Sequence, residues 1–145
     1  MTTVAAILKH KGYSVATVTP TALINEVVAT LNERRIGAVL VVDQANQLLG
    51  VVSERDIVRS LDANGARTLE MTAGQLMTRA LHLAHPDTTV AEAMQMMTAG
   101  RFRHLPVVEH DSLIGLVSIG DVVKARIMQQ DSTVESLTAY VAGST

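Results

Sequence analysis

The chain has 145 residues but no cysteine and no tryptophan, and its aromatic residues are two tyrosines and one phenylalanine. Without cysteine it can form no disulfide framework, thiolate nucleophile or zinc finger. Hydrophobic residues make up 48% of the sequence, so the core must be built from aliphatic side chains. A chain of this length buries about two thirds of its unfolded surface, and it therefore needs neither a covalent nor a metal staple.

A strong charge of one sign and a long hydrophobic run are also missing. The net charge is −2 and the basic residues are scattered, whereas a nucleic-acid-binding protein carries them in a patch or stripe. The longest apolar run, residues 36–42, falls far short of the roughly 20 residues that span a bilayer. The N-terminus contains no signal-peptide core and leads into Lys9, His10 and Lys11, which are expected to form a solvated face. We therefore expect a cytoplasmic protein with neither a membrane nor a nucleic acid as partner.

What the sequence does contain is an internal repeat, in which a residue pattern recurs 65 or 66 positions later. The matching residues are Pro20 and Pro86, Glu26 and Glu92, Arg35 and Arg101, Gly50 and Gly115, and Asp56 and Asp121. The offset falls by one residue between the third and fourth pairs, which places a one-residue deletion in the turn of the second copy. Self-similarity of this kind indicates that one structural unit is used twice.

Each copy has the pattern of a helix, a strand hairpin and a second helix. Apolar residues recur at helical spacing in 22–35 and 90–99, and two β-branched, apolar runs separated by a polar turn follow each of these segments. The runs are 36–42 and 48–52 in the first copy, and 102–108 and 113–117 in the second. Ser53 and Ser118 are expected to cap the helices that follow, because a serine oxygen accepts from an N–H two or three residues on.

We therefore predict an α/β (α+β) fold of two pseudo-twofold-related motifs, each a small sheet with two packed helices. The assigned ranges are 7–66 for the first motif with the start of the linker, 76–132 for the second, and 133–145 for a C-terminal tail. A short helical turn precedes each motif, at 4–9 and at 73–78, and a short strand follows it near Val18 and near Leu83. One unit of about 45 residues cannot bury both of its faces alone, so the two sheets are expected to meet with a cleft between them.

Three features carry a resemblance to a known family: the proline before each helix, the strand 103–108 with the sequence Arg-His-Leu-Pro-Val-Val, and the tails 53–57 and 118–122. Repeated in this order, they resemble a tandem CBS domain pair, or Bateman module, over nearly the whole chain. The chain is similar to small stand-alone bacterial proteins that consist of one such pair. The resemblance implies two CBS motifs and a regulatory module that senses an adenosyl ligand. AMP and ATP are favoured, with ADP, NAD(H) and S-adenosylmethionine as other ligands of the family.

The resemblance also implies two ligand clefts, in which strand residues of one motif meet the Ser-x-x-Asp tail of the other. The first cleft would combine Ser53, Arg55 and Asp56 with Ala84, His85, Arg103 and His104. The second would combine Ser118 and Asp121 with Val18, Thr19, Gly37 and Ala38. The extra polar residues all fall in the first cleft, which is therefore expected to prefer phosphorylated ligands.

The chemistry of the Ser-x-x-Asp tail supports a ribose contact. A carboxylate held at a helix N-terminus can accept hydrogen bonds from the two vicinal hydroxyls of a ribose, each worth about 1.5 to 3 kcal/mol. The competing interpretation is that Ser53 and Ser118 each start a capping box that stabilises a helix and binds nothing. Spacing alone favours the capping box, and only the resemblance favours a ligand. Because aromatic residues are so few, an adenine ring would lie between aliphatic side chains.

No residue set for catalysis stands out. The sequence has no arguable Ser-His-Asp set and no glycine-rich phosphate loop, so we expect no enzyme activity and no catalytic cofactor. His82 and His85 have a spacing that suits a metal, but in a polar loop they are expected to face water, and we predict no metal site. The alternative function is a protein-interaction or assembly module with vestigial ligand sites. Under either function we expect a homodimer that acts on an unidentified protein target.

Overall fold

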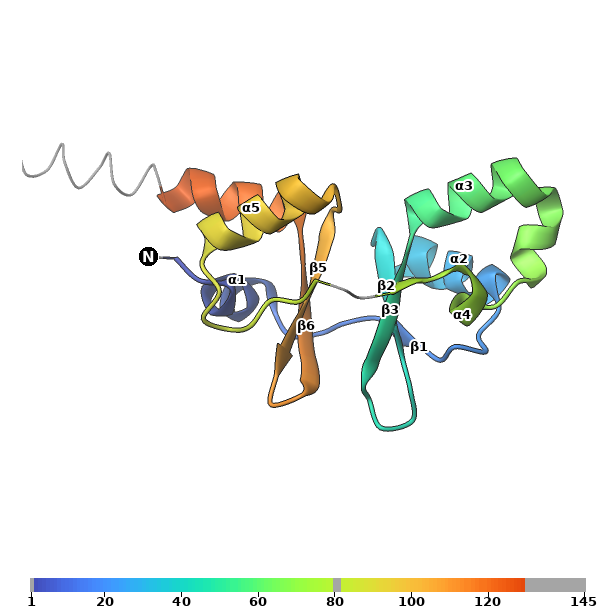
Figure 1. Cartoon of the computed structure of the whole chain (residues 1–145), viewed down its shortest axis with the longest axis horizontal. Helices are drawn as coiled ribbons and strands as arrows, with labels where there is room; N and C mark the ends of the chain where they lie inside the picture. Colours follow the sequence, from blue (N-terminus) through green and yellow to red (C-terminus); the bar gives the residue numbers. More distant parts are fainter. Residues whose placement is uncertain (1, 80–81, 130–145) are drawn as a thin grey trace, which may run out of the picture.

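The computed structural model describes residues 2–79 and 82–129. Figure 1 shows two lobes, each with a strand hairpin towards the centre of the molecule and helices towards the outside. The fold is mixed α/β, as predicted, and the described strands form one four-stranded and one two-stranded sheet. The predicted tail at 133–145 and the last residues of the second predicted motif, 130–132, lie outside this part of the chain.

The first lobe follows the predicted order of elements. These are β1 (Thr17–Val18), α2 (Ile24–Arg34), β2 (Ala38–Val42), β3 (Leu48–Ser53) and α3 (Glu54–Asn64). A 3-10 helix that was not predicted, η1 (Gly65–Glu70), follows where the linker was expected to start. Strand β2 lies between β1, to which it is parallel, and β3, to which it is antiparallel. All residues of β2 are buried, because both faces of the strand are covered, and the run is accordingly apolar throughout.

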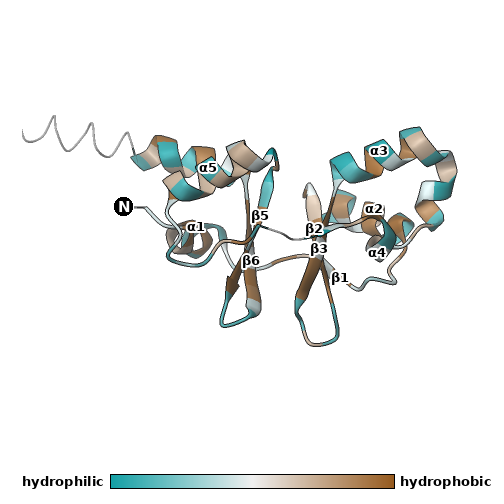
Figure 2. Ribbon diagram, viewed as in Figure 1, coloured by the Kyte–Doolittle hydropathy of each residue, from teal (hydrophilic) through white to brown (hydrophobic). Residues whose placement is uncertain are grey.

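The second lobe repeats this arrangement. It consists of α5 (Val90–Gly100), β5 (His104–Glu109), β6 (Ser112–Ser118) and a final helix that includes residues 119–129. The two short elements that come before α5 in the chain, α4 (Ala73–Leu76) and β4 (Thr78–Arg79), lie on the first lobe, where β4 pairs with β3. Both hairpins are antiparallel and have a register shift at the same place, between Val41 and Val42 and between Val107 and Val108. Their strands are predominantly hydrophobic (Figure 2). The two copies of the sequence repeat therefore share one structure, including the same register shift in the strand pairing.

The helix that precedes each motif packs against the opposite lobe. Helix α1 (Val4–Lys11) contributes Val4, Ile7 and Leu8 to the core of the second lobe, whereas Ala73 of α4 belongs to the core of the first. In Figure 1, α1 accordingly lies near α5 and α4 lies near α2. Neither core is complete within one copy of the sequence repeat.

Backbone hydrogen bonds hold the two exchanged helices in equivalent positions. They run from Val4 to Thr88, Ala5 to Pro86 and Val90 to Thr2 in one lobe, and from Ala73 to Ala22, Gly74 to Pro20 and Ile24 to Met71 in the other, at 2.7–2.9 Å. The repeated prolines thus serve as acceptors for the helix of the other copy. This is a structural reason for their recurrence in the sequence.

The repeated glycines Gly50 and Gly115 make room for the same exchange. A Cβ at Gly115 would lie 2.7 Å from the side chain of Leu8, and a Cβ at Gly50 would lie 2.6 Å from the carbonyl oxygen of Thr78. Each glycine is crossed by the segment that precedes the other motif. A larger residue at either position would push that segment away.

Leu8→Ala is expected to lower the free energy of unfolding by about 2 to 5 kcal/mol, because it removes a large aliphatic side chain from the core of the second lobe. Leu8 is fully buried. The measurement is urea denaturation of the full chain. Lys9→Ala, at an exposed position of the same helix, is the matched control and should change the free energy by less than about 0.5 kcal/mol. Equal effects of the two substitutions would contradict the docking of α1 on the second lobe.

Candidate functional site

A cleft of about 510 Å³ opens between the two lobes. Its walls come from the end of β3 and the first turns of α3, from β4, and from the stretch that joins α5 to β5. Five of the residues that the sequence assigns to the first cleft line it together: Ser53, Arg55, Asp56, Arg103 and His104. The tail of the first motif therefore meets the strand entrance of the second, although the two segments lie far apart in the sequence.

Asp56 is partly buried and is held by a capping box. The amide and the hydroxyl of Ser53 both donate to its Oδ2 atom, at 2.9 Å each, and the Asp56 amide donates to Ser53 Oγ at 3.2 Å. The Thr78 hydroxyl approaches the other oxygen, Oδ1, at 3.5 Å, which is too long for a strong hydrogen bond. The predicted capping box is thus confirmed, but it uses one carboxylate oxygen and leaves the other able to accept from a ligand.

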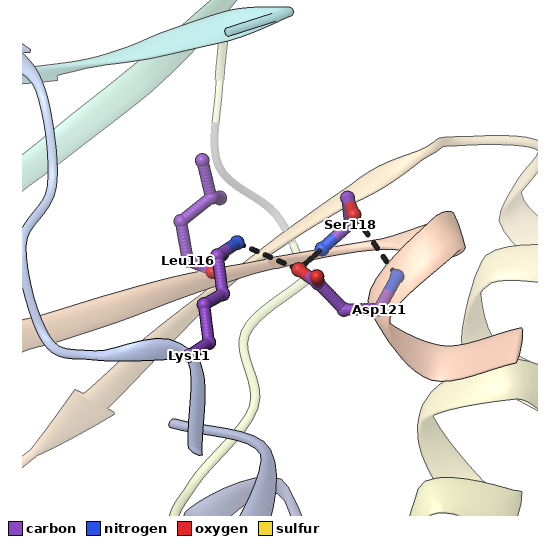
Figure 3. Close-up of polar contacts among 4 residues, drawn as sticks. All are labelled: Lys11, Leu116, Ser118 and Asp121. Atoms are coloured by element: carbon purple, nitrogen blue, oxygen red, sulfur yellow. Dashed lines mark hydrogen bonds and ion pairs between the residues drawn. The ribbon is translucent and has the colours of Figure 1, made fainter. Parts of the chain in front are cut away.

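Asp121 has the same cap but a different neighbour. The Ser118 amide donates to its Oδ2 atom at 2.8 Å, and the Asp121 amide donates to Ser118 Oγ at 3.1 Å. The Lys11 ammonium donates to the same Oδ2 at 2.6 Å and to the Leu116 carbonyl at 2.9 Å (Figure 3). Lys11 was expected on a solvated face, and it is exposed, but the docking of α1 on the second lobe also brings its ammonium to Asp121, a contact that was not predicted.

The lysine also determines the acidity of this carboxyl. Burial by itself raises the pKa of Asp121, but hydrogen bonds from Lys11 and from the Ser118 amide, together with the lysine charge, outweigh burial and hold the pKa below its ordinary value. Asp121 is therefore ionised at neutral pH and paired with a cation from the first copy of the repeat.

His104 lies between the two carboxylate sites. It begins β5, opposite Ser118 of β6, and its ring lies against Gly37. Burial and then the charge of Lys11 lower the pKa of His104 below its ordinary value, and these effects exceed the opposing attraction of nearby carboxylates. At neutral pH this side chain is an uncharged imidazole. It can donate one hydrogen bond to a phosphate but supplies no positive charge.

Three residues predicted for the clefts are placed differently. Ala84 is fully buried in the core of the second lobe, because its parallel bridge to Val107 turns its side chain inward. His85 is exposed, and its Nδ1 atom lies 3.2 Å from a backbone carbonyl of β5. Neither residue is part of the cleft wall. Gly37, which was predicted for the second cleft, lines the first one, since it faces the ring of His104.

The other strand residues predicted for the second cleft are mostly covered by the first lobe. Ala38 is buried in β2, and Val18 packs against the core of that lobe. The Thr19 hydroxyl lies 3.2 Å from the Thr21 hydroxyl. A ligand cleft at Asp121 therefore stays a prediction.

Three arginines that were not predicted, Arg59, Arg79 and Arg101, line the cleft together with Arg55 and Arg103. The cleft lining thus contains five arginines and two carboxylate residues, Glu54 and Asp56. None of the five forms an ion pair with another described residue. Arg59 follows Arg55 by one helical turn, a spacing that places both on one face of α3, so this residue could have been found from the sequence. Arg101 lies two residues before Arg103, which was predicted for the cleft, whereas Arg79 comes from β4 and carries no such signal.

A pair of stacked rings forms another unpredicted part of the cleft. His82 and Phe102 both line it, and their ring centroids lie 4.8 Å apart with an angle of 17° between the planes. The low aromatic content of the chain suggested a ligand contact made only by aliphatic groups. The structure instead provides a flat ring surface at the cleft, built by two residues that the sequence does not connect.

The described residues contain no group of three or more His, Cys, Asp or Glu side chains placed to hold a metal ion. None of the helices in residues 2–79 and 82–129 is both long enough and apolar enough to cross a membrane. The absence of a metal site stays a prediction.

Comparison with known sequences matches both copies of the repeat. The model of the family described as "CBS domain" matches residues 4–63 and 73–127. The chain is 34% identical over 150 residues to the CBS domain-containing protein CBSX3, mitochondrial, of Arabidopsis thaliana, in an alignment that covers 98% of this chain and 73% of that protein. It also matches CBSCBSPB2 of the same plant, with 35% identity, but spans only 20% of that longer protein.

Solved structures agree with these matches. A CBS-domain containing protein from Agrobacterium tumefaciens superposes with a TM-score of 0.83 at 42% identity, covering 86% of this chain and 99% of the other. The crystal structure of CBSX2 in complex with AMP superposes with a TM-score of 0.72 at 26% identity, covering 90% and 99% of the two chains. Because one family accounts for both halves of the repeat and for the way they pack, the chain belongs to the CBS domain family and is a tandem pair of its motifs.

Proposed function

We propose that this CBS pair is a regulatory module that binds an adenine nucleotide in the cleft lined by Asp56. CBS domain proteins are generally regulatory and non-catalytic modules. The observation that carries the proposal is the convergence of a capped carboxylate and five arginines, drawn from both motifs, on one cleft. Within residues 2–79 and 82–129, none of these arginines has an ion-pair partner. The structural neighbour CBSX2 is in complex with AMP, which supports an adenosyl ligand for this chain.

Asp56 is suited to the ribose of such a ligand. It stands in the first turn of α3, where free N–H groups and the helix dipole favour a negative charge. A carboxylate offers about four acceptor positions, and Ser53 uses two of them on Oδ2. The remaining positions can accept from the two ribose hydroxyls. Since the capping box already fixes the side chain, little rotamer entropy is lost on binding.

The arginines are suited to the phosphates. A guanidinium group binds phosphate oxygens in a bidentate manner and is always charged. With five such groups against two carboxylates in the wall, the cleft favours the ligand that carries the most negative charge. ATP and ADP should therefore bind more tightly than AMP, and NAD(H), with two phosphates, is also compatible. S-adenosylmethionine is disfavoured, because its sulfonium group is positively charged.

The stacked pair of His82 and Phe102 is suited to the base. A flat ring surface can stack with an adenine, and such contacts contribute on the order of 1 to 3 kcal/mol per base. The pair and the arginines of the segment 101–103 line the same cleft. Base, ribose and phosphates would thus contact both lobes at once. A bound nucleotide then favours one relative arrangement of the lobes, by the difference in its affinity for the two arrangements.

An exposed apolar helix face supports the homodimer and also the alternative function, an assembly module that acts through a protein target. Val58 of α3 is 63% exposed, and in the final helix Ile127 and Met128 are 52% and 55% exposed. Val123, the counterpart of Val58, is exposed as well. Because equivalent helices of both motifs present this face, we propose that it packs against the same face of a second copy.

A thermal-shift screen with ATP, ADP, AMP, NADH and S-adenosylmethionine tests the nucleotide site. A ligand at a hundred times its dissociation constant should stabilise the chain by about 2.7 kcal/mol. Asp56→Asn keeps a capping acceptor but loses the charge, and it should weaken ATP binding by roughly tenfold or more, since hydrogen bonds to a charged group are worth about 1.5 to 3 kcal/mol. Asp121→Asn alters the equivalent capping box and is the matched control. No shift with any of the ligands would favour the assembly module, and a larger loss in the control would contradict the assignment of Asp56.

Calorimetric titration with AMP, ADP and ATP tests the role of the cleft arginines. The wild-type affinity should rise with each added phosphate, and Arg59→Gln combined with Arg101→Gln should reduce the preference for ATP over AMP by roughly tenfold or more, because each charge-assisted hydrogen bond is worth about 1.5 to 3 kcal/mol. Arg35→Gln is the control. Arg35 is the C-cap residue of α2, as Arg101 is of α5, and both have left-handed backbone, with φ of 53° and 57°. Unlike Arg101, Arg35 does not line the cleft. Equal affinities for AMP and ATP in the wild type would contradict a triphosphate ligand.

A further inference from the structure

Lys11, in the first copy of the repeat, forms an ion pair with Asp121 in the second copy. We propose that Lys11 is a built-in occupant of the Asp121 site, so that the chain binds one nucleotide, at Asp56, and none at Asp121. The inference rests on the proposed function of the Asp56 cleft. It makes Lys11 the residue that determines how many ligands the pair holds.

The Lys11 side chain reaches the part of the second lobe that Thr78 reaches in the first, although Lys11 lies six residues after Ala5 and Thr78 four residues after Gly74, the two residues that donate to the repeated prolines. Lys11 is the last residue of α1, and Thr78 follows the end of α4, the counterpart of α1. Thr78 pairs with Val51 of β3, and Lys11 donates to the carbonyl of Leu116, which is the counterpart of Val51 in β6. Both side chains then reach the capped aspartate of their lobe. The repeat therefore presents the same site twice, with a different side chain over each carboxylate.

The two side chains differ in what they leave accessible. The Thr78 hydroxyl is neutral and 3.5 Å from Asp56 Oδ1, whereas the Lys11 ammonium is charged and 2.6 Å from Asp121 Oδ2, the oxygen that the Ser118 amide also caps. A charge-assisted hydrogen bond is roughly twice as strong as a neutral one. The two side chains of the ion pair are 39% and 24% exposed, so solvent and salt screen it less than a fully exposed pair. A neutral ribose diol would meet a carboxylate whose charge the ammonium already compensates, so each hydrogen bond that it donates to Asp121 would be weaker than one to an uncompensated carboxylate.

The backbone positions Lys11 before any ligand arrives. Leu8, one turn earlier on α1, is fully buried in the core of the second lobe and lies over Gly115. Gly12 follows Lys11 with a φ of +108°, which favours glycine, and its amide donates to the Leu8 carbonyl at 2.6 Å. The helix thus ends directly after the lysine. The contact of Lys11 with Asp121 therefore follows from the docking of α1 on the second lobe.

Amide NMR titration of the full chain with ATP, and separately with adenosine, reads both sites at once. In the wild type, the ligands should shift the Ser53 and Asp56 amides and leave the Ser118 and Asp121 amides unchanged. Lys11→Met keeps the aliphatic stem and removes the charge. In this variant the Ser118 and Asp121 amides should respond as well, with at least about tenfold tighter binding at that site, as expected when a charged competitor is removed.

Two matched variants separate the ion pair from other effects. Lys11→Arg retains a cation and should behave as the wild type, and Lys9→Met changes an exposed lysine of the same helix and should do so too. A dispersed amide spectrum verifies that each variant is folded. Lys11→Met without a response at Ser118 and Asp121, or with weaker binding there, would overturn the inference, as would a wild-type response at these two amides.

The same titration distinguishes failure of the inference from failure of the proposed function. If the wild type shows no response at Ser53 and Asp56, the nucleotide site proposed for the first cleft is wrong. The inference about Lys11 is then supported if Lys11→Met gains a response at Asp121, and it is overturned together with the proposed function if that variant binds nothing.

Discussion

The exchange of α1 and α4 between the lobes is the constraint on which the rest of the structure depends. Each aliphatic core lacks one helix until the other copy of the repeat provides it. The exchanged helices are attached through main-chain hydrogen bonds to the repeated prolines and their neighbours. The separation of the lobes, and with it the width of the cleft, is therefore determined by backbone contacts, and the side chains that line the cleft are free to differ between the two copies.

That freedom explains how a nearly symmetric backbone carries two unlike carboxylate sites. Both aspartates are capped in the same way by a serine three residues earlier. What differs is contributed by segments outside the cap: a threonine reaches one aspartate and a lysine the other. The cleft shows the same divergence, because Gly37 and its counterpart Arg103 both line it. The wall formed by the second motif is rich in cations, and the opposing wall keeps a glycine where the His104 ring needs room.

Local patterns were sufficient to predict the repeat, the order of helices and strands, and the capping serines, since each depends on spacing along one segment. The approach of the Asp56 tail to Arg103 and His104 was also predicted, but through the resemblance to CBS pairs. The docking of α1 on the opposite lobe could not be predicted, because an apolar helix face fits either core equally well. The contact between Lys11 and Asp121 could not be predicted for the same reason: a lysine at the end of a helix is usually solvated, and only the exchange brings this one to a carboxylate.

Side-chain direction and distant pairings account for the remaining differences. Near Leu83 the structure has, in place of the predicted short strand, a single bridge from Ala84 to Val107. Alternate residues of extended backbone face opposite sides, and Ala84 faces the core. His82 and Phe102 meet because a loop and a helix end are brought together by tertiary packing. The composition gives the number of aromatic residues, but it does not predict that Phe102 lies at the cleft beside His82.

The capping boxes have one more consequence. Each Ser-x-x-Asp sequence satisfies amides at the start of a helix whether or not a ligand is present. Helix stability alone is therefore enough to retain the aspartate after a site has lost its ligand, and the same carboxylate stays in place for a later gain of binding. In repeats of this kind, the number of Ser-x-x-Asp sequences therefore indicates how many helices are capped, and not how many ligands are bound.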